Sequence, residues 1–505
     1  MPDLPQRTVI VIGAGISGLA AAVRLKTAGV DVVVLEARDR VGGRILTDDS
    51  WGVPIDLGGS WVHGTDNNPL LVSRDPPLYT GRLFTDQSYA YYRPKTFIPT
   101  SLFEMTRYYL NFTAIESRLS ARQSSHDDSS LDVSAEEFYR TESAAVGNRM
   151  RRWWRGESAA RDMEDVLMNL FHATISASGG DPEAVSVSAD WNSFYQKRTL
   201  DAIAADGMGT VIQNLMRYGD LAVGRNILLE KAVTRIQYGD ALAGSSNPSS
   251  PPKVRITCTD GTVFESRHVV VTVPIGVLKA HHKTLFDPVL PPKVVGAIDG
   301  LGAGLLDKVV LRFERKWWKS TTAFSSFFLD ELPTSTPPIP GSFKKYPHYP
   351  FYIVDISKVS DAPVLAVLCY RLWAEAAEVA HPESVVNMIF DALKKTIGRG
   401  VEDVPRPFDY KITKWFTDPY SLCSYSYLPT GLGSFSTAQD RTFRTFQTPV
   451  AGVVGFAGEH TSEMDWSSIH GAWMSGDREG RRIVAALVGE GSKVGDRRLM
   501  DGEKL

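Results

Sequence analysis

A glycine-rich turn near the start of the chain narrows the choice of fold more than any other segment. The apolar run Thr8–Ile12 predicts a buried strand, and Gly13-Ala14-Gly15-Ile16-Ser17-Gly18 follows it directly. An apolar helical rhythm then continues to about Gly29, and Asp31–Glu36 predicts a second buried strand in a parallel sheet. A strand, a glycine turn, a helix and a strand in this order predict a dinucleotide-binding unit.

The residues of the turn have distinct physical roles in such a unit. Gly13, Gly15 and Gly18 allow a tight turn, close approach of a pyrophosphate, and close packing of the helix on the strand. Ser17 lies in the first turn of the helix, whose amides would point at the phosphates. Glu36 ends the second strand at the spacing where a carboxylate binds ribose hydroxyls.

NAD, NADP and FAD all bind to this kind of unit. Arg38, just after Glu36, would suit the extra phosphate of NADP. However, Gly42-Gly43-Arg44 and Asp56–Trp61 follow at short distance, and they supply backbone space and a cation near a second phosphate. These blocks shift the prediction to FAD.

Size and composition argue against several other classes of protein. A chain of 505 residues is too long for one simple core, so we expect two intertwined domains. The net charge of −3 predicts neither a nucleic-acid nor a membrane partner, and no run approaches the ~20 apolar residues of a membrane span. Cys258, Cys369 and Cys423 form no CxxC pair, so we expect no disulfide framework and no metal.

The distribution of these signals predicts an α/β fold with a discontinuous cofactor domain. The region Pro69–Ala205 is helical and irregular in pattern, and a late helix is predicted at Gly471–Val488. Further strands are predicted at Asn226–Gln237, Lys253–Cys258, Val269–Pro274 and Gly452–Phe456. We expect a doubly wound FAD-binding domain (residues 1–72, 206–300 and 416–490), a mixed α+β substrate domain (73–205 and 301–415) and a polar tail (491–505).

Beyond the turn, the sequence resembles the flavin-containing amine oxidase family, which includes polyamine oxidases, monoamine oxidases and histone lysine demethylases. The resemblance spans most of the chain, but the helical region between Val72 and Asp190 matches poorly. The matching blocks are Val9–Ile45, Asp56–Gly64, Lys231–Ile236, Val269–Leu278, Leu306–Phe313, Trp415–Tyr427 and Gly455–Ile483.

The resemblance implies contacts with FAD along these blocks. Glu36, Arg38 and Arg44 would hold the ADP portion, and Val233 would touch the adenine. The helix that starts near Gly471 would point its amides at the pyrimidine edge of the flavin, where reduction places negative charge. The other residues expected to contact FAD are Gly43, Gly58, Gly59, Ser60, Trp61, Trp415, Gly458, Glu459 and Ile469.

Lys308 and His63 are the expected catalytic residues. Alternation along Lys308–Phe313 alone predicts a solvated strand lysine, but the family places a lysine here that binds a water facing flavin N5. His63 falls where spermine and acetylpolyamine oxidases carry a histidine near the substrate amine. A neutral imidazole can accept a hydrogen bond from that amine, which must be deprotonated before it gives up a hydride. The alternative is a packed histidine that donates to a backbone carbonyl.

Tyr425 matches one wall of the aromatic cage that flanks the amine in this family; the alternative is a core tyrosine. The other wall, usually aromatic, is Ser468 here, so we expect a wider or more polar pocket, with Trp466 as a substitute wall. Monoamine oxidases attach FAD through a cysteine immediately before the cage tyrosine. Ser424 occupies that position here and Cys423 is one residue too early, so we expect non-covalent FAD.

These residues predict an enzyme that oxidises an amine, with a polyamine or another extended amine as the favoured substrate. Hydride would pass from the amine α-carbon to flavin N5, the imine would hydrolyse to an aldehyde or ketone, and oxygen would be reduced to hydrogen peroxide. An L-amino-acid oxidase stays an alternative, as does a flavin-bound protein without amine oxidation. The sequence contains no long antiparallel coiled coil of the kind expected for a chromatin demethylase. We expect a cytoplasmic location, with Glu503-Lys504-Leu505 as a weak peroxisomal signal.

Overall fold

The larger sheet is built around the glycine turn. The structure is a computed structural model that describes residues 6–72, 77–92, 101–124, 133–154, 156–176, 178–187, 201–239, 253–333, 348–432 and 439–492. The eight strands are β13 (Phe286–Asp287), β10 (Val233–Tyr238), β11 (Val254–Cys258), β12 (Val263–Val271), β1 (Gln6–Ile12), β2 (Val32–Leu35) and β9 (Ile227–Leu228) in spatial order, with β21 (Val454–Phe456) also on β12. β1 lies between β12 and β2 and is parallel to both, so the predicted strand–turn–helix–strand unit forms the centre of the sheet.

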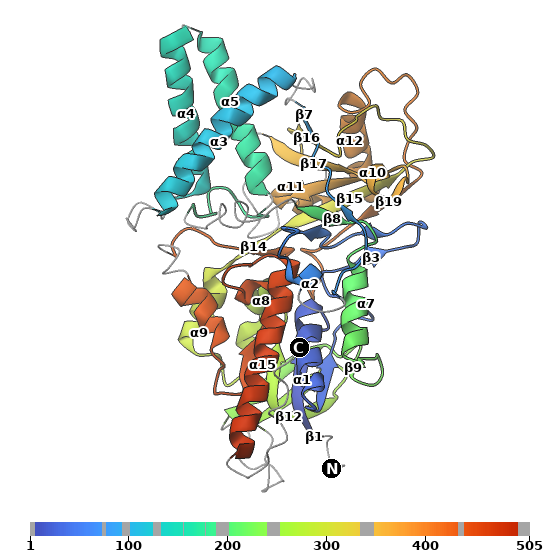
Figure 1. Cartoon of the computed structure of the whole chain (residues 1–505), viewed down its shortest axis with the longest axis vertical. Coiled ribbons are helices and arrows are strands. Elements are labelled where there is room, and N and C mark those ends of the chain that lie inside the picture. The colour runs from blue at the N-terminus through green and yellow to red at the C-terminus, as the bar shows by residue number, and fades with distance from the viewer. Residues whose placement is uncertain are drawn as a thin grey trace.

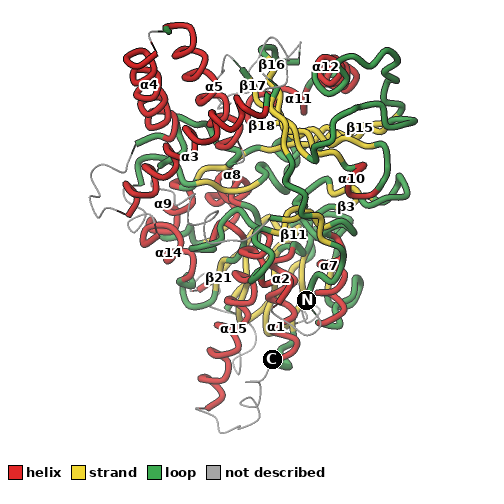
Figure 2. Tube along the Cα trace, turned by 45° about the horizontal axis from the view of Figure 1, so that its top comes forward, coloured by secondary structure: helices red, strands yellow, loops and turns green. Residues whose placement is uncertain are grey.

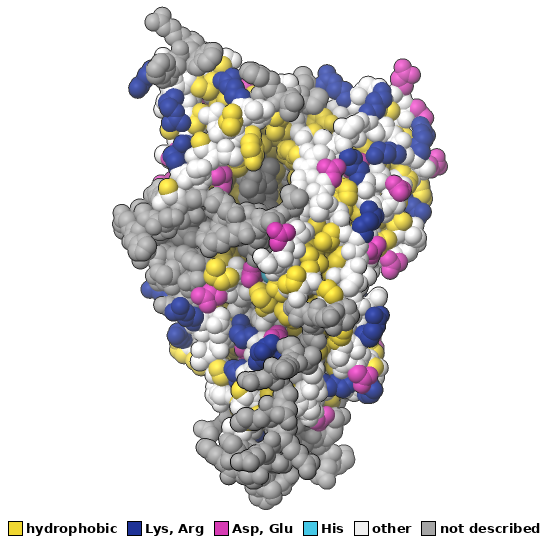
Figure 3. Space-filling model, viewed as in Figure 1, with side chains coloured by type: hydrophobic (Ala, Val, Ile, Leu, Met, Phe, Trp, Pro, Cys, Tyr) yellow, Lys and Arg dark blue, Asp and Glu magenta, His cyan; other side chains and the backbone are white. Residues whose placement is uncertain are grey.

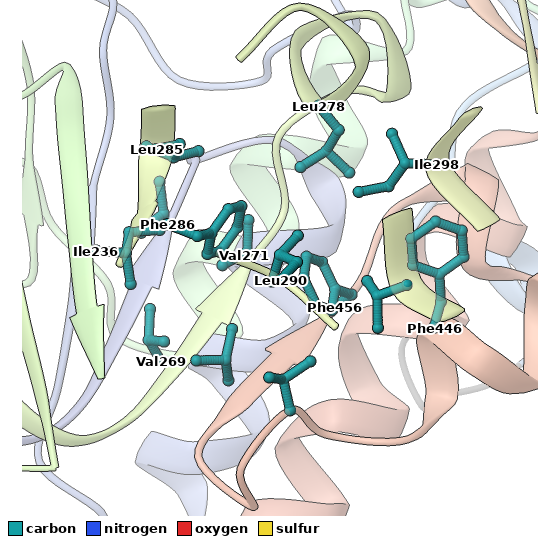
Figure 4. Close-up of a cluster of buried hydrophobic side chains, with 14 of the residues drawn as sticks. Ile236, Val269, Val271, Leu278, Leu285, Phe286, Leu290, Ile298, Phe446 and Phe456 are labelled. Carbon is teal, nitrogen blue, oxygen red and sulfur yellow. The ribbon is translucent and has the colours of Figure 1, made fainter. Parts of the chain in front are cut away.

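Helices cover both faces of this sheet, because its strands are apolar on both sides. These helices are α1 (Ile16–Thr27), α7 (Gly209–Tyr218), α15 (Ile469–Ser492), α8 (Ile275–Leu285), α9 (Pro292–Gly300) and α14 (Arg444–Gln447). Val9 and Val11 pack with α1, α7 and α15 on one face. Ile10 and Ile12 face the other side, where the core continues into α8, α9 and α14. Figure 4 shows the centre of this second core, with Val271 and Phe456 from adjacent parallel strands.

A second sheet of six strands occupies the upper half of the molecule in Figure 1. Its order is β19 (Asp409–Ile412), β15 (Leu306–Arg312), β18 (Val364–Tyr370), β17 (Tyr349–Asp355), β16 (Phe324–Leu329) and β7 (Tyr89–Tyr91). All pairs are antiparallel except β16 with β7. One face packs on α11 (Arg371–Val379) and α12 (Pro382–Lys395), and the other packs on Trp51 and Ile203.

The faces of β15 follow the predicted alternation, but neither face is solvated. Val309 and Leu311 belong to the core under α11 and α12, whereas Val310 belongs to the core on the opposite face. Lys308 is 7% exposed. The solvated lysine that alternation alone predicts is therefore wrong, because a second layer of structure covers this face.

Three helices form a group beside the second sheet (Figure 1 and Figure 2): α3 (Leu102–Ser124), α4 (Ala135–Trp154) and α5 (Glu157–Ser176). α4 and α5 have 20 residues each and run antiparallel, and Tyr139 stacks on Phe171 between them with ring centroids 4.1 Å apart. At 1.5 Å per residue this pair is about 30 Å long. The region predicted to be helical and irregular thus contains a helical hairpin with an aromatic core.

Small sheets join segments that are distant in the sequence. They are β5 (Trp61–Val62) with β8 (Ala202–Ala204) and β6 (Leu83–Phe84), β3 (Thr47–Asp48) with β4 (Ile55–Asp56), and β14 (Gly302–Gly304) with β20 (Tyr425–Tyr427). The β5–β8 and β14–β20 pairings cross the predicted domain boundaries, and the division itself stays a prediction. The remaining short elements are α2 (Pro69–Val72), α10 (Ser357–Ser360), and the single turns Gln439–Phe443 and Glu459–Thr461.

The structure describes only the first two residues of the predicted C-terminal tail. The predicted tail begins inside α15, which continues to Ser492; the rest of the tail, with Glu503–Leu505, lies outside the described residues. Among the residues that the structure describes, no helix is both long enough and apolar enough to cross a membrane.

Candidate active site

A cavity of about 610 Å³ extends from the glycine turn of the larger sheet to β15 of the second sheet. This volume lies in the range of sites for cofactors and small ligands. Apolar side chains gather on the molecular surface between the lower and upper halves in Figure 3. Every site residue predicted from the sequence lines the cavity except Gly18 and Trp466. The lining includes Gly13, Gly15, Ser17, Glu36, Arg38, Gly43, Arg44, Gly58, Gly59, Ser60, Trp61, His63, Val233, Lys308, Trp415, Tyr425, Gly458, Glu459, Ser468 and Ile469.

The glycine turn has free space at Gly15 and none at Gly18. Gly15 is the N-cap residue of α1, and a side-chain carbon added there would lie 4.0 Å from its nearest neighbour, the carbonyl oxygen of Gly42. A carbon added at Gly18 would lie 1.9 Å from the carbonyl oxygen of Gly13. Gly18 therefore closes the packing of α1 on β1, while the open side of Gly15 and the first amides of α1 fit a pyrophosphate.

Glu36 and Arg38 define the far end of the cavity. The buried carboxylate of Glu36 accepts hydrogen bonds from the amides of Ala14 (2.7 Å) and Arg38 (2.9 Å), which holds it at the predicted ribose position. Arg38 Nη2 donates to both oxygens of Asp418 (2.8 and 2.9 Å) and to Ser421 Oγ (2.9 Å). Because its charge is already paired, Arg38 is poorly placed for the extra phosphate of NADP.

Arg44 and Glu459 form an ion pair in the cavity wall, with Arg44 Nη1 3.1 Å from Glu459 Oε1. Arg44 also donates to the backbone oxygen of Ser424 (2.8 Å), and Glu459 accepts from Ser426 Oγ (2.6 Å) and the amide of Ser467 (3.0 Å). Burial would raise the pKa of Glu459, but the charge of Arg44 and these bonds outweigh it, so the pKa is lowered. The ionised carboxylate therefore fastens three separate segments of the wall.

Lys308 extends from β15 to the segment from Asp56 to Ser60, which contains three of the predicted flavin contacts. Its Nζ donates to the backbone oxygens of Asp56 (2.7 Å) and Gly58 (2.7 Å) and to Ser60 Oγ (3.1 Å). Burial lowers the pKa of Lys308 to about 8, although the charge of Asp56 acts in the opposite direction. Burial also raises the pKa of Asp56 to about 6, against hydrogen bonds from Thr47 and the amide of Met208. Both groups can therefore change charge close to neutral pH.

His63 follows β5 and contacts a carboxylate that the sequence did not indicate. Its Nδ1 lies 3.0 Å from Asp201 Oδ2, while Asp201 Oδ1 accepts from the amide of Gly64 at 3.0 Å. Asn68 Nδ2 donates to the backbone oxygen of His63 (2.9 Å). Nδ1 thus bonds a carboxylate rather than the backbone carbonyl of the alternative interpretation. No motif marks Asp201, which lies just beyond the region that matches the family poorly.

The predicted aromatic cage is only partly present among the described residues. Tyr425 in β20 lines the cavity, and so does Ser468. Ser468 Oγ accepts a hydrogen bond from the amide of Gly471 (3.0 Å), so this serine caps the N-terminus of α15. Trp466 is buried against Phe443, with ring centroids 5.7 Å apart, and does not line the cavity. The prediction that Trp466 replaces the second wall is wrong.

The environment of Cys423 disfavours a bond to the cofactor. Cys423 is buried, whereas Ser424 and Tyr425 line the cavity. Burial raises the pKa of the Cys423 thiol to about 11, so the nucleophilic thiolate is scarce at neutral pH.

A sequence profile described as "Flavin containing amine oxidoreductase" matches residues 16–484. The chain belongs to this family. It is therefore an enzyme, a flavin-containing amine oxidoreductase, and its cofactor is FAD, as the sequence predicted. The open Gly15 turn, the amides of α1 and the ribose-side carboxylate of Glu36 fit that cofactor.

The relatives include oxidases and demethylases. The probable polyamine oxidase 4 of Arabidopsis thaliana is 30% identical over 486 residues, covering 93% of this chain and 86% of the relative. A peroxisomal N(1)-acetyl-spermine/spermidine oxidase of Bos taurus is 27% identical, covering 94% of each chain. Human lysine-specific histone demethylase 2 is 28% identical over 96% of this chain, which spans only 54% of that relative.

The solved structure of a wild-type putrescine oxidase bound to putrescine is similar to this fold. The TM-score is 0.66 at 19% sequence identity, and the match covers 95% of this chain and 99% of the oxidase. At this identity the likeness shows the fold alone, which is the flavin amine oxidase fold.

Gly15→Ala and Gly18→Ala should separate cofactor binding from folding. The Gly15 methyl would project into the cavity, so FAD affinity should fall about tenfold or more while the apoprotein keeps its thermal midpoint. The Gly18 methyl would collide with the Gly13 carbonyl and should destabilise the apoprotein by about 1–3 kcal/mol. Flavin absorbance per protein and thermal unfolding measure the two effects. Equal losses of flavin and stability in both variants would contradict the assignment of Gly15 to the cofactor.

His460 should make the fold sensitive to acid. Its ring is fully buried edge-on against Phe446, and neither ring nitrogen has a hydrogen-bond partner among the described residues. Burial lowers the pKa of His460 from 6.5 to about 4, despite the attraction of Glu459. Because the folded state favours the neutral ring, the stabilising contribution is complete above pH 6.5 and is lost as the pH falls to about 4. The total is about 3 kcal/mol.

Urea unfolding of the parent protein and of His460→Leu at pH 7 and pH 4 measures this contribution. The variant should lose less stability than the parent between the two pH values, by about 2–3 kcal/mol. An identical loss in both proteins would show that His460 does not titrate in this window.

Proposed function

We propose that this enzyme oxidises extended polar amines in the cavity that Lys308, His63 and Tyr425 line. The observation that carries the proposal is the joint placement of Lys308 and His63. Lys308 holds the wall from Asp56 to Ser60, and His63 follows three residues after Ser60 in that same wall. A lysine and a histidine are thereby brought to one side of a cavity that also holds Tyr425.

Bound FAD would supply the redox step, accepting hydride from the amine α-carbon and passing the electrons to oxygen to give hydrogen peroxide. Gly15, Ser17 and the amides of α1 would hold the pyrophosphate, with Glu36 at the ribose. Ser60 and Trp61 would lie beside the flavin ring. We propose that FAD is held without a covalent bond, because Ser424 stands before Tyr425 and Cys423 is a buried thiol.

His63 would prepare the substrate for oxidation. An alkylammonium with a pKa near that of lysine, ~10, has no lone pair to assist hydride loss, so the enzyme must favour the neutral amine. His63 would accept a hydrogen bond from the amine nitrogen and orient it. Lys308 would exchange its contact with Ser60 Oγ for a water molecule and orient that water for hydrolysis of the imine to an aldehyde or ketone.

The charges that line the cavity favour an amine over an amino acid. An L-amino-acid oxidase needs an arginine to clamp the substrate carboxylate with two hydrogen bonds. Among the described lining residues the arginines are Arg38 and Arg44, and each is already paired with a carboxylate, Asp418 or Glu459. Ser468, where an aromatic wall is usual, leaves room for an extended chain rather than a compact aromatic ring.

Anaerobic bleaching of the flavin tests the substrate class. Polyamines, monoamines, aminoalcohols and amino acids are mixed with the oxidised enzyme without oxygen, and flavin reduction is followed by absorbance. We expect a higher kcat/KM for an extended polar amine than for benzylamine. The flavin should also be released by acid or heat. Bleaching by amino acids alone would favour the amino-acid oxidase, and no bleaching by any compound would reject amine oxidation.

Lys308→Met should impair both stability and chemistry. The substitution leaves the buried oxygens of Asp56 and Gly58 without their donor, which should cost about 1–3 kcal/mol of stability. The rates of flavin reduction or reoxidation should also fall, and a pH-dependent change near pH 8 in the parent protein should disappear.

Lys279→Met is the matched control for this experiment. Like Lys308, Lys279 donates from Nζ to three oxygen atoms, which here are the backbone oxygens of Ile298, Asp299 and Leu301, but it does not line the cavity. Its substitution should lower stability without changing either half-reaction. Stopped-flow traces for Lys308→Met that match those of Lys279→Met would reduce Lys308 to a structural residue.

A further inference from the structure

The carboxylate of Asp201 contacts a backbone amide and a ring nitrogen of His63, which lines the cavity. Asp201 immediately precedes β8, and the pairing of β8 with β5 brings it beside His63 from 138 residues away in sequence. One oxygen accepts from the amide of Gly64 and the other lies 3.0 Å from His63 Nδ1. A backbone amide can only donate, so the orientation of the carboxylate is set independently of the histidine.

We propose that Asp201 is a positioning residue that holds His63 in the Nδ1–H tautomer, so that Nε2 is the acceptor for the substrate amine. The proposal rests on the proposed amine oxidase function of the cavity. An ionised carboxylate has no proton to donate, so the hydrogen between the two groups belongs to Nδ1. A neutral imidazole then carries its acceptor lone pair on Nε2.

The tautomer decides whether His63 can assist the reaction. With Nε2 as acceptor, the ring accepts an N–H of the amine and leaves the nitrogen lone pair available to assist hydride loss. With Nε2–H as donor, the ring would instead bind that lone pair and withdraw it from the reaction. The same residue is therefore productive in one tautomer and inhibitory in the other.

Two further hydrogen bonds fix the backbone on either side of the contact between His63 and Asp201. Asn68 Nδ2 donates to the backbone oxygen of His63, and Gln87 Nε2 donates to the backbone oxygen of Asp201, both at 2.9 Å. The two side chains are 23% and 22% exposed, so water reaches them but does not surround them. These two backbone contacts hold the two segments without using Asp201 Oδ2, the oxygen that lies against the ring.

Asp201→Asn should invert the tautomer. The amide of Gly64 still requires an acceptor, so it selects the oxygen of the new asparagine and turns the NH₂ group toward His63 Nδ1. Nδ1 must then accept, and the ring proton moves to Nε2. Asp201→Ala removes the partner altogether and lets the ring adopt either tautomer. Gln87→Ala is the matched control, because it removes a contact to the Asp201 backbone and spares the carboxylate.

Two measurements on the FAD-loaded enzyme test the proposal. ¹⁵N NMR with labelled histidine reports which ring nitrogen is protonated, and His63→Gln identifies the His63 signals among the ten histidines. Stopped-flow absorbance reports anaerobic flavin reduction by the best amine of the panel. We expect Nδ1–H in the parent protein and in Gln87→Ala, and Nε2–H in Asp201→Asn. Flavin reduction should slow about 100-fold or more in Asp201→Asn but only about tenfold in Asp201→Ala.

The order of the two variants distinguishes a chemical role from a structural one. A purely structural carboxylate would make the near-isosteric asparagine the milder change, so an equal or milder effect of Asp201→Asn would overturn the proposal. Nε2–H in the parent protein would overturn it as well. If no amine reduces the flavin of the parent protein, the proposed function fails, while the NMR spectra still decide the tautomer.

Discussion

The ammonium group of Lys308 joins the second sheet to the wall of the cofactor cavity. It leaves β15 from a buried face and satisfies two backbone oxygens and one hydroxyl of the segment from Asp56 to Ser60. Gly58 and Gly59 lie in that segment and Trp61 directly follows it, so the predicted flavin side of the cavity depends on a side chain from the other sheet. A buried cation is tolerated there because its three protons have acceptors and a carboxylate lies nearby.

Elsewhere in the cavity wall, charged side chains are likewise paired with groups of opposite charge. Arg38 is paired with Asp418 and Arg44 with Glu459, so both arginines lie in ordered positions before any ligand arrives. Glu459 also accepts hydrogen bonds from Ser426 and Ser467, which fastens the start of α15 to β20. The wall is thereby pre-organised, and binding energy is not spent on ordering it.

Local features of the sequence predicted which residues line the glycine-turn end of the cavity. The glycine turn and Glu36 depend on neighbours within a single strand–helix–strand unit, so their positions could be predicted from spacing, while their contacts with FAD stay a prediction. Lys308 required family resemblance, because alternation along a strand does not reveal what covers each face. Ser468 directly precedes a helix, and that position alone could have suggested a cap.

Contacts between distant segments could not be predicted. The pairing of β8 with β5 brings Asp201 to His63 over 138 residues of sequence, and Asp418 approaches Arg38 over 380 residues. For Trp466 the sequence predicted a contact that the structure does not contain. Its position near Ser468 suggested a place in the cage wall, but its ring packs against Phe443 in the core. No local pattern distinguishes these outcomes, since each depends on the final register of remote strands.

The way the helical group is attached bears on how this enzyme family can diversify. α3, α4 and α5 lie outside both large sheets, and the chain rejoins the cavity through the short pairing of β8 with β5 and β6. Lengthening or shortening a surface insertion costs little entropy once its ends are anchored. Evolution can therefore change the length of this insertion and preserve the glycine turn. The condition is that β8 keeps its register with β5, because that register places residue 201 beside His63.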